Sequence, residues 1–158
     1  MALLYAKPTE YAIRALTYLA VNADQAAISV QEIAKAEQIS SHHLSKVMKN
    51  LARRKFVLAL RGPGGGYRLL RDPQDISIWE VMGCLGAQGE FDECAIGWAA
   101  CADENPCPLH DQWLGVRAQI RLYLEGVMIS DLAGVSAHKR QGLRAAATLQ
   151  IALPGGGT

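Results

Sequence analysis

Two short runs of helical spacing, separated by only three residues, constrain the fold of this chain most strongly. A serine followed three positions later by a glutamate opens the first run, which covers 29–37 and places Val30, Ile33 and Ala34 on one side. The second run covers 41–54 and also gathers its apolar residues on one side. A helix over 8–22 precedes both. Two short helices joined by a tight turn predict a helix-turn-helix.

The period of the hydrophobic residues changes after this motif. Residues 56–60 form a short apolar run typical of a strand, and residues 67–70 form a second one. The six residues between them, 61–66, include four glycines, which allow a tight turn. These segments predict a β-hairpin, the wing of a winged-helix domain. A second serine–glutamate box, at Ser77 and Glu80, predicts another helix to about residue 85.

A long helix is predicted over 109–129, because hydrophobic residues recur there at every third or fourth position. The residues of this stripe are Trp113, Val116, Ile120, Tyr123 or Leu124, and Val127. Such a long stripe needs a partner, and a second copy of the same helix supplies one, so we expect a homodimer through helix 109–129. The predicted fold class is mainly α with a small β-hairpin wing: a winged helix-turn-helix plus a long dimerisation helix.

We expect the chain to divide into three regions. Residues 1–73 form the winged helix-turn-helix DNA-binding domain. Residues 74–132 hold a linker helix, a cysteine-rich loop and the dimerisation helix. Residues 133–158 form a flexible C-terminal tail, which ends in a glycine-rich stretch.

Charge is segregated along the chain although its net value is only +1. Residues 1–71 contain eleven Lys or Arg against four Asp or Glu, whereas residues 72–112 contain nine acidic side chains and no basic ones. Residues 113–158 are mildly basic. This pattern indicates a basic face that attracts phosphate and an acidic region held away from it.

The exposed side of the predicted helix at 41–54 carries the candidate DNA contacts. In a helix-turn-helix the first turns of the second helix meet base edges in the major groove. The candidates on this helix are His42, His43, Ser45, Lys46, Lys49, Arg53 and Arg54. The last two are expected at phosphates, and Arg61 of the hairpin turn is expected at a minor groove. A solvated basic helix face is the alternative interpretation of the same residues.

Three cysteines and a histidine form the most distinctive cluster: Cys94, Cys101, Cys107 and His110, spaced C-x6-C-x5-C-x2-H. Zinc sites usually contain closer cysteine pairs, so structural zinc is the second choice. Thiolates with one harder ligand suit an iron–sulfur cluster, which tolerates wider spacing. His110 is either a ligand or only an N-terminal residue of the long helix. Cys84 lies among apolar helix residues and is expected to be a buried structural thiol.

The sequence argues against several other classes. It has no segment resembling a signal peptide and no run of apolar residues long enough for a membrane span, so a cytoplasmic location without membrane association is expected. It contains no C-x2-C redox pair, no phosphate-binding loop and no Ser/His/Asp array, so we do not expect an enzyme.

The turn at 61–67, the helix segment 39–47, the opening segment 11–16 and the cysteine–histidine set together resemble the Rrf2 family, with its IscR-like and NsrR-like members. The resemblance covers residues 1 to about 132. It implies a dimeric winged-helix transcription factor that binds double-stranded promoter DNA, with binding modulated by an iron–sulfur cluster that senses iron–sulfur status, nitric oxide or redox stress.

The resemblance also implies the ligands. Cys94, Cys101 and Cys107 match the three cluster cysteines, and His110 matches the fourth ligand of a 2Fe–2S cluster in IscR-like members. Glu10 aligns with an acidic residue that completes a 4Fe–4S cluster from the partner chain in NsrR-like members. We favour 2Fe–2S, with 4Fe–4S as the alternative. A winged-helix regulator without metal, whose cysteines are redox-active or inert, is the alternative function.

Overall fold

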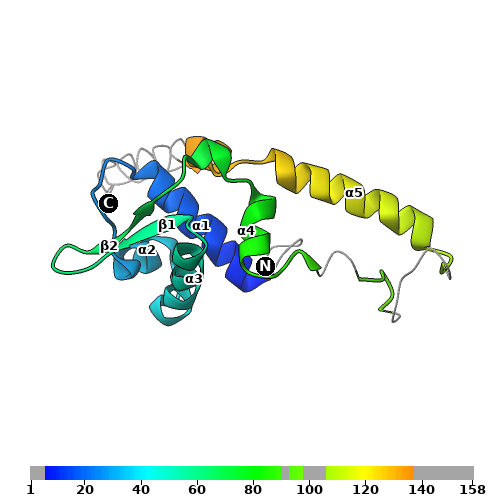
Figure 1. Cartoon of the computed structure of the whole chain (residues 1–158), viewed down its shortest axis with the longest axis horizontal. Coiled ribbons are helices and arrows are strands. Elements are labelled where there is room, and N and C mark those ends of the chain that lie inside the picture. The colour runs from blue at the N-terminus through cyan, green and yellow to red at the C-terminus, as the bar shows by residue number, and fades with distance from the viewer. Residues whose placement is uncertain (1–5, 90–92, 98–105, 137–158) are drawn as a thin grey trace, which may run out of the picture.

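The computed structural model describes residues 6–89, 93–97 and 106–136 (Figure 1). It confirms the predicted fold class, because helices form most of the described chain and the two strands form a single hairpin. The elements in order are α1 Lys7–Val21, α2 Val30–Glu37, α3 Ser41–Arg53, β1 Val57–Leu60, β2 Gly66–Leu69, the 3-10 turn η1 Pro73–Asp75, α4 Ile78–Cys84 and α5 His110–Gly126. Residues 129–136 are helical as well.

Helices α2 and α3 form the predicted helix-turn-helix. The hydroxyl of Ser29 caps α2 by accepting a 3.2 Å hydrogen bond from the amide of Glu32. Gln38 then turns the chain with a left-handed backbone at φ 54°, where glycine is the usual residue. Its amide bonds back to the last carbonyls of α2, so the turn is closed without a glycine.

The core lies where α1 packs against α2, α3, β2 and α4. Burial of its apolar side chains supplies the main driving force for folding. The largest fully buried side chains include Leu16 of α1, Ile33 of α2, Leu44, Met48 and Leu51 of α3, and Met82 of α4. Because three of these belong to α3, this helix is fixed to the domain along its whole apolar stripe, which leaves its polar side exposed.

The wing is an antiparallel hairpin in which Val57 pairs with Leu69 and Leu60 pairs with Gly66. Outside the hairpin, Ile28 pairs with Tyr67 through two backbone hydrogen bonds of 2.9 and 2.8 Å. This close approach leaves no room for a side chain at Gly66, since a Cβ there would collide with the Ile28 backbone. The wing is therefore fastened to the loop that precedes α2.

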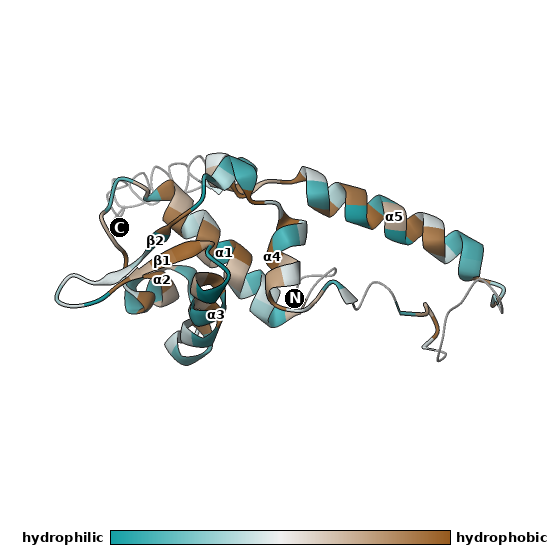
Figure 2. Ribbon diagram, in the orientation of Figure 1, coloured by the Kyte–Doolittle hydropathy of each residue, from teal (hydrophilic) through white to brown (hydrophobic). Residues whose placement is uncertain are grey.

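Helix α5 extends away from the winged-helix body (Figure 1) and contacts the body through α4. Its hydrophobic residues are spread along its whole length (Figure 2). Near its C-terminal end Leu124 is buried, and Ile120 and Val127 pack against the core. By contrast, Leu122 and Tyr123 are 72% and 59% exposed in the single chain.

The predicted C-terminal limit of this helix, residue 129, is wrong. Helix α5 ends at Gly126, and Val127 is extended. The reason is tertiary: the carbonyl of Val127 accepts a 3.0 Å hydrogen bond from the amide of Ile78, and Ile129 donates one of 2.9 Å to the carbonyl of Ile76. These bonds form an antiparallel bridge between Ser77 and Met128, after which the chain becomes helical again.

Candidate nucleic-acid interface and cysteine segment

The polar side of α3 forms a continuous basic surface. Leu44, Val47, Met48 and Leu51 face the core and Ala52 packs at its edge, so the charged residues of the helix face solvent. Exposed on this side are His42, His43, Lys46, Lys49 and Arg53, followed by Arg54 and Lys55. Helix α3 contains no acidic residue that would cancel their charge. Such a surface attracts the phosphate backbone of nucleic acid.

Local contacts hold two of the candidate residues on α3. The hydroxyl of Ser45 donates a 2.7 Å hydrogen bond to the carbonyl of Ser41, one helical turn earlier. Arg53 donates a 3.0 Å bond to the side-chain oxygen of Asn50. The rings of His42 and His43 meet edge to face, with centroids 5.7 Å apart. Of these side chains, Ser45 is the one whose donor already bonds the helix backbone.

Arg61 lies in the exposed turn between β1 and β2. The turn is closed by a 2.9 Å bond from the amide of Gly65 to the carbonyl of Gly62. Gly62 and Gly64 both have positive φ values, at 96° and 73°, which other residues rarely adopt. The glycines predicted to shape this turn therefore do so, and Arg61 stands at its start.

The cysteine segment, residues 93–110, joins the region after α4 to the start of α5. The structure describes Cys94, Cys107 and His110, whereas Cys101 lies outside the described residues. The indole Nε1 of Trp113 donates a 3.0 Å hydrogen bond to the carbonyl of Glu93. This bond brings the residue next to Cys94 against the first turns of α5.

The other end of the segment is fixed by the helix itself. His110 is the first residue of α5 and only 4% exposed, and its amide bonds the carbonyl of Cys107 at 2.9 Å. Within residues 6–89, 93–97 and 106–136, no three His, Cys, Asp or Glu side chains form a group that could hold a metal ion. A site formed by all three cysteines would include Cys101 and so extends beyond these residues.

Cys84, the last residue of α4, packs against the core but is only partly buried, which is less than the buried thiol predicted. It lies at the edge of the core, which continues past the end of α4 to the buried Ala87. Burial nevertheless raises the pKa of the Cys84 thiol above its ordinary value, and the nearby charges of Arg54 and Arg53 oppose this effect.

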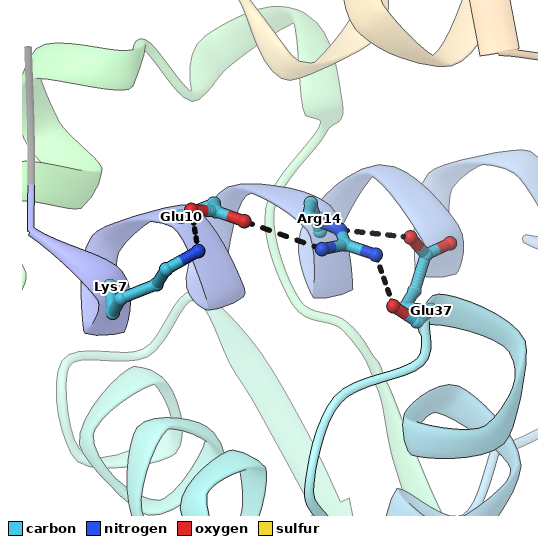
Figure 3. A network of polar contacts seen from close by, with 4 residues as sticks. All are labelled: Lys7, Glu10, Arg14 and Glu37. Carbon is cyan, nitrogen blue, oxygen red and sulfur yellow. Dashed lines mark hydrogen bonds and ion pairs between the residues drawn. The ribbon is translucent and has the colours of Figure 1, made fainter. Parts of the chain in front are cut away.

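Glu10, the alternative fourth ligand, belongs to a polar network on α1 (Figure 3). Its carboxylate accepts hydrogen bonds from Lys7 at 2.8 Å and Arg14 at 3.4 Å. The hydrogen bond from Lys7 is the main cause that lowers the pKa of Glu10, and the positive charges of Lys7 and Arg14 add to this effect against a smaller opposing effect of burial. Arg14 also bonds the side chain of Glu37 at 3.2 Å and the Glu37 carbonyl. The network thus joins α1 to the end of α2, immediately before the turn to α3.

Sequence patterns did not identify two side chains that hold this architecture together. The spacing places Trp113 in the apolar stripe, whereas in the structure its indole N–H donates to the carbonyl of Glu93 in the cysteine segment. Its position three residues after His110, on the same side of the helix, is the signal that points to this role. Arg71, which binds Glu80 across nine residues, has no such signal in the sequence.

Comparison with known proteins agrees with the winged helix-turn-helix fold. Residues 5–134 match the model of the Rrf2 family, described as iron-dependent transcriptional regulators. A protein of Aquifex aeolicus described as an HTH-type transcriptional regulator is 33% identical over 135 residues, which cover 84% of this chain and 93% of that protein. The HTH-type transcriptional regulator IscR of Aliivibrio salmonicida is 27% identical over 122 residues, covering 77% and 72%.

Solved structures share the fold. CymR, the global cysteine regulator of B. subtilis, aligns with a TM-score of 0.70 at 21% identity, covering 85% of this chain and 98% of that one. IscR of T. potens aligns with a TM-score of 0.68, also at 21% identity, covering 86% and 90%. Among the described residues, no helix is both long and apolar enough to span a lipid bilayer.

Proposed function

Since this chain belongs to the Rrf2 family of transcriptional regulators, we propose that it binds promoter DNA as a homodimer whose affinity is modulated by an iron–sulfur cluster. The family and the relatives are regulators of transcription, and the chain is therefore a regulator and not an enzyme. The proposal goes further in three respects: the residues that contact DNA, the dimer and the cluster.

DNA contact is supported by the basic side of α3 and the wing beside it. His42, His43, Ser45, Lys46 and Lys49 are proposed to face the major groove, because they occupy the first turns of the second helix of the motif. Arg53 and Arg54, at the end of α3, are proposed to contact phosphates. Arg61 of the wing is proposed to enter a minor groove. Phosphate contacts fix the register of the protein, whereas groove contacts select the sequence.

Dimer formation is supported by the apolar surface of α5. Among the exposed large hydrophobic side chains on this helix, Val116 and Tyr123 lie two turns apart on one side, whereas Leu114 and Leu122 face away from them. A soluble protein rarely leaves such a surface uncovered. A second copy of α5 covers it with a matching surface, as in a twofold dimer. The same dimer places two copies of α3 for two half-sites about one helical turn apart.

The cluster is supported by one observation above all, the bond from Trp113 to Glu93. It holds Cys94 close to the turn of α5 that carries His110 and follows Cys107. Thiolates and a shielded imidazole are a donor set suited to iron–sulfur ligation, so the residues present fit the group. Cys94, Cys101, Cys107 and His110 are the proposed ligands of a 2Fe–2S cluster. Glu10 of the partner subunit is the alternative fourth ligand, for a 4Fe–4S cluster.

A bound cluster would supply a centre whose ligation responds to iron, oxidants or nitric oxide. The response of the protein then depends on its own residues. The cysteine segment lies between α4 and α5, and Gln88 beyond α4 binds the carbonyl of Trp79 at 2.8 Å. A change in the conformation of the segment therefore acts on both helices, and through them on the spacing of the two α3 helices.

Anaerobic purification followed by visible absorption and iron and sulfide analysis tests this proposal. We expect a brown protein with iron and sulfide in equal amounts, and we expect Cys94→Ser, Cys101→Ser or Cys107→Ser to abolish the colour. The matched control is Cys84→Ser, which should leave it unchanged. A colourless protein with stoichiometric zinc would contradict the cluster. DNA affinity that is unchanged by oxidants and by all three substitutions would instead support a regulator without metal.

A further inference from the structure

Arg71, directly after the wing, makes contacts in two directions. Its guanidinium carbon lies 5.3 Å from the centre of the ring of Phe56, which follows α3. Its two terminal nitrogens bind both carboxylate oxygens of Glu80, at 3.2 and 3.4 Å, and one of them also binds the carbonyl of Asp75. Arg71 therefore joins the segment between α3 and β1 to the start of α4.

The start of α4 is in turn fastened to the end of α5. Glu80 and Ser77 form a complete capping box, with reciprocal 3.2 Å hydrogen bonds between each side chain and the other residue's amide. Ser77 also pairs with Met128, and Ile76 and Ile78 exchange backbone hydrogen bonds with the 127–129 segment. A continuous chain of contacts thus runs from Phe56 through Arg71, Glu80 and Ser77 to the segment that follows the C-terminal end of α5.

We propose that Arg71 is a positioning residue that fixes the angle between the winged-helix domain and α5, and so sets which half-site spacing the dimer accepts. This inference rests on the proposed dimer and its DNA binding, and it does not depend on a metal. A guanidinium suits the role because its planar fork holds two carboxylate oxygens while its face stacks on an aromatic ring.

The contact between Arg71 and Glu80 mainly fixes the orientation of α4 and adds little to the stability of the fold. The side chains of Arg71 and Glu80 are 35% and 45% exposed, and ion pairs at such exposure add little to the free energy of folding. DNA binding depends more strongly on the relative orientation of the two α3 helices, because one added base pair rotates a half-site by about a tenth of a turn. Loss of the fork should therefore affect the choice of spacing more than folding or contact with a single half-site.

The test compares duplexes selected from a random pool by the wild-type protein. They are rebuilt as one half-site, as two half-sites at the selected spacing, and with one base pair added or removed. We expect Arg71→Met to reduce the preference for the selected spacing by about fivefold, a typical coupling between contacting groups. Its affinity for one half-site should change less than about twofold. Arg71→Lys should have the same effect as Arg71→Met, because lysine keeps the positive charge but cannot bind both carboxylate oxygens as the planar guanidinium does.

A double-mutant cycle separates this role from a general loss of stability. If Arg71 acts through Glu80, the effects of Arg71→Met and Glu80→Gln on spacing preference are not additive. Ile13→Val, which trims a buried core residue of α1, is the control for lost stability and should leave the preference intact.

Three outcomes would overturn the inference: unchanged spacing preference in Arg71→Met, the same loss in Ile13→Val, or equal weakening of one and two half-sites with a smaller salt dependence. The last would mean that Arg71 contacts phosphate directly. A wild-type protein that selects no paired half-sites would instead contradict the proposed dimeric function itself, which distinguishes the two failures.

Discussion

The indole nitrogen of Trp113 and the carbonyl oxygen of Glu93 are 3.0 Å apart, twenty residues apart in sequence, and this bond closes the cysteine segment onto α5. Trp113→Phe keeps most of the ring and removes the donor. One hydrogen bond is worth about 1 kcal/mol, so the closed arrangement should become about fivefold less populated. The measurement is the yield of intramolecular Cys94–Cys107 cross-linking by a short bismaleimide in iron-free protein with Cys84→Ser and Cys101→Ser.

Tyr123→Phe, a comparable aromatic change on the same helix, serves as the control and should leave the cross-linking yield unchanged. Mass spectrometry separates cross-links within one chain from those between chains. An equal yield with and without the indole donor would show that Trp113 does not hold the segment.

Gly66→Ala should destabilise the domain by about 3 kcal/mol, because the new methyl group would meet the backbone of Ile28 and weaken its two bonds to Tyr67. The measurement is urea unfolding at a fixed protein concentration. Gly64→Ala is the matched control, since its Cβ meets nothing and only its φ of 73° is unfavourable, at a cost of about 1 kcal/mol. Equal losses in the two variants would contradict the close approach at Gly66.

Arg53→Ala should lower the dependence of DNA affinity on salt, because an exposed arginine at a phosphate releases counterions when it binds. The expected decrease in the slope of log affinity against log salt is about 1. Titration of a labelled duplex at several salt concentrations measures it. Arg121→Ala, on α5 away from α3 (Figure 1), should leave the slope unchanged. An unchanged slope in Arg53→Ala would contradict a phosphate contact by Arg53.

Cys84 should react with iodoacetamide at a higher pH in the folded protein than in the unfolded chain. Burial raises the pKa of its thiol, so less of the reactive thiolate is present at any pH below that value. The measurement is the midpoint of the pH–rate profile with the other three cysteines changed to Ser, in the presence and absence of urea. Arg54→Met should raise the folded midpoint further, because the positive charge of Arg54 lowers this pKa. Identical midpoints for folded and unfolded protein would contradict the effect of burial.

The sequence predicts the fold well where the signal is local. The serine–glutamate boxes at Ser29 and Ser77 predict the starts of α2 and α4, and in both the serine hydroxyl accepts the expected bond. The glycines of 61–66 predict the wing turn because a positive φ is a property of one residue and its neighbours. The turn at 38–40 is predicted, but the left-handed backbone of Gln38 within it is not, because glutamine does not favour that conformation.

The end of α5 and the closure of the cysteine segment are missed for a different reason. Both depend on hydrogen bonds between residues far apart in sequence, Ile78 with Val127 and Glu93 with Trp113. No local pattern encodes such pairs. The basic side of α3 was predictable because helical periodicity alone separates its core residues from its exposed ones. The roles of the individual cysteines and of the DNA-facing side chains stay predictions, for the experiments above to test.

Helix α5 ends at Gly126, and the bridge between Ser77 and Met128 fixes the chain just beyond that end. The 17 residues of α5 correspond to a rod of about 25 Å, with His110 at the end far from the bridge and Cys107 just before it. On a rod of that length, a tip displacement of about 2 Å turns the base by about 5°. In the proposed switch, a modest rearrangement among the cysteines is thereby converted into rotation beneath the winged-helix body, without any unfolding of α5.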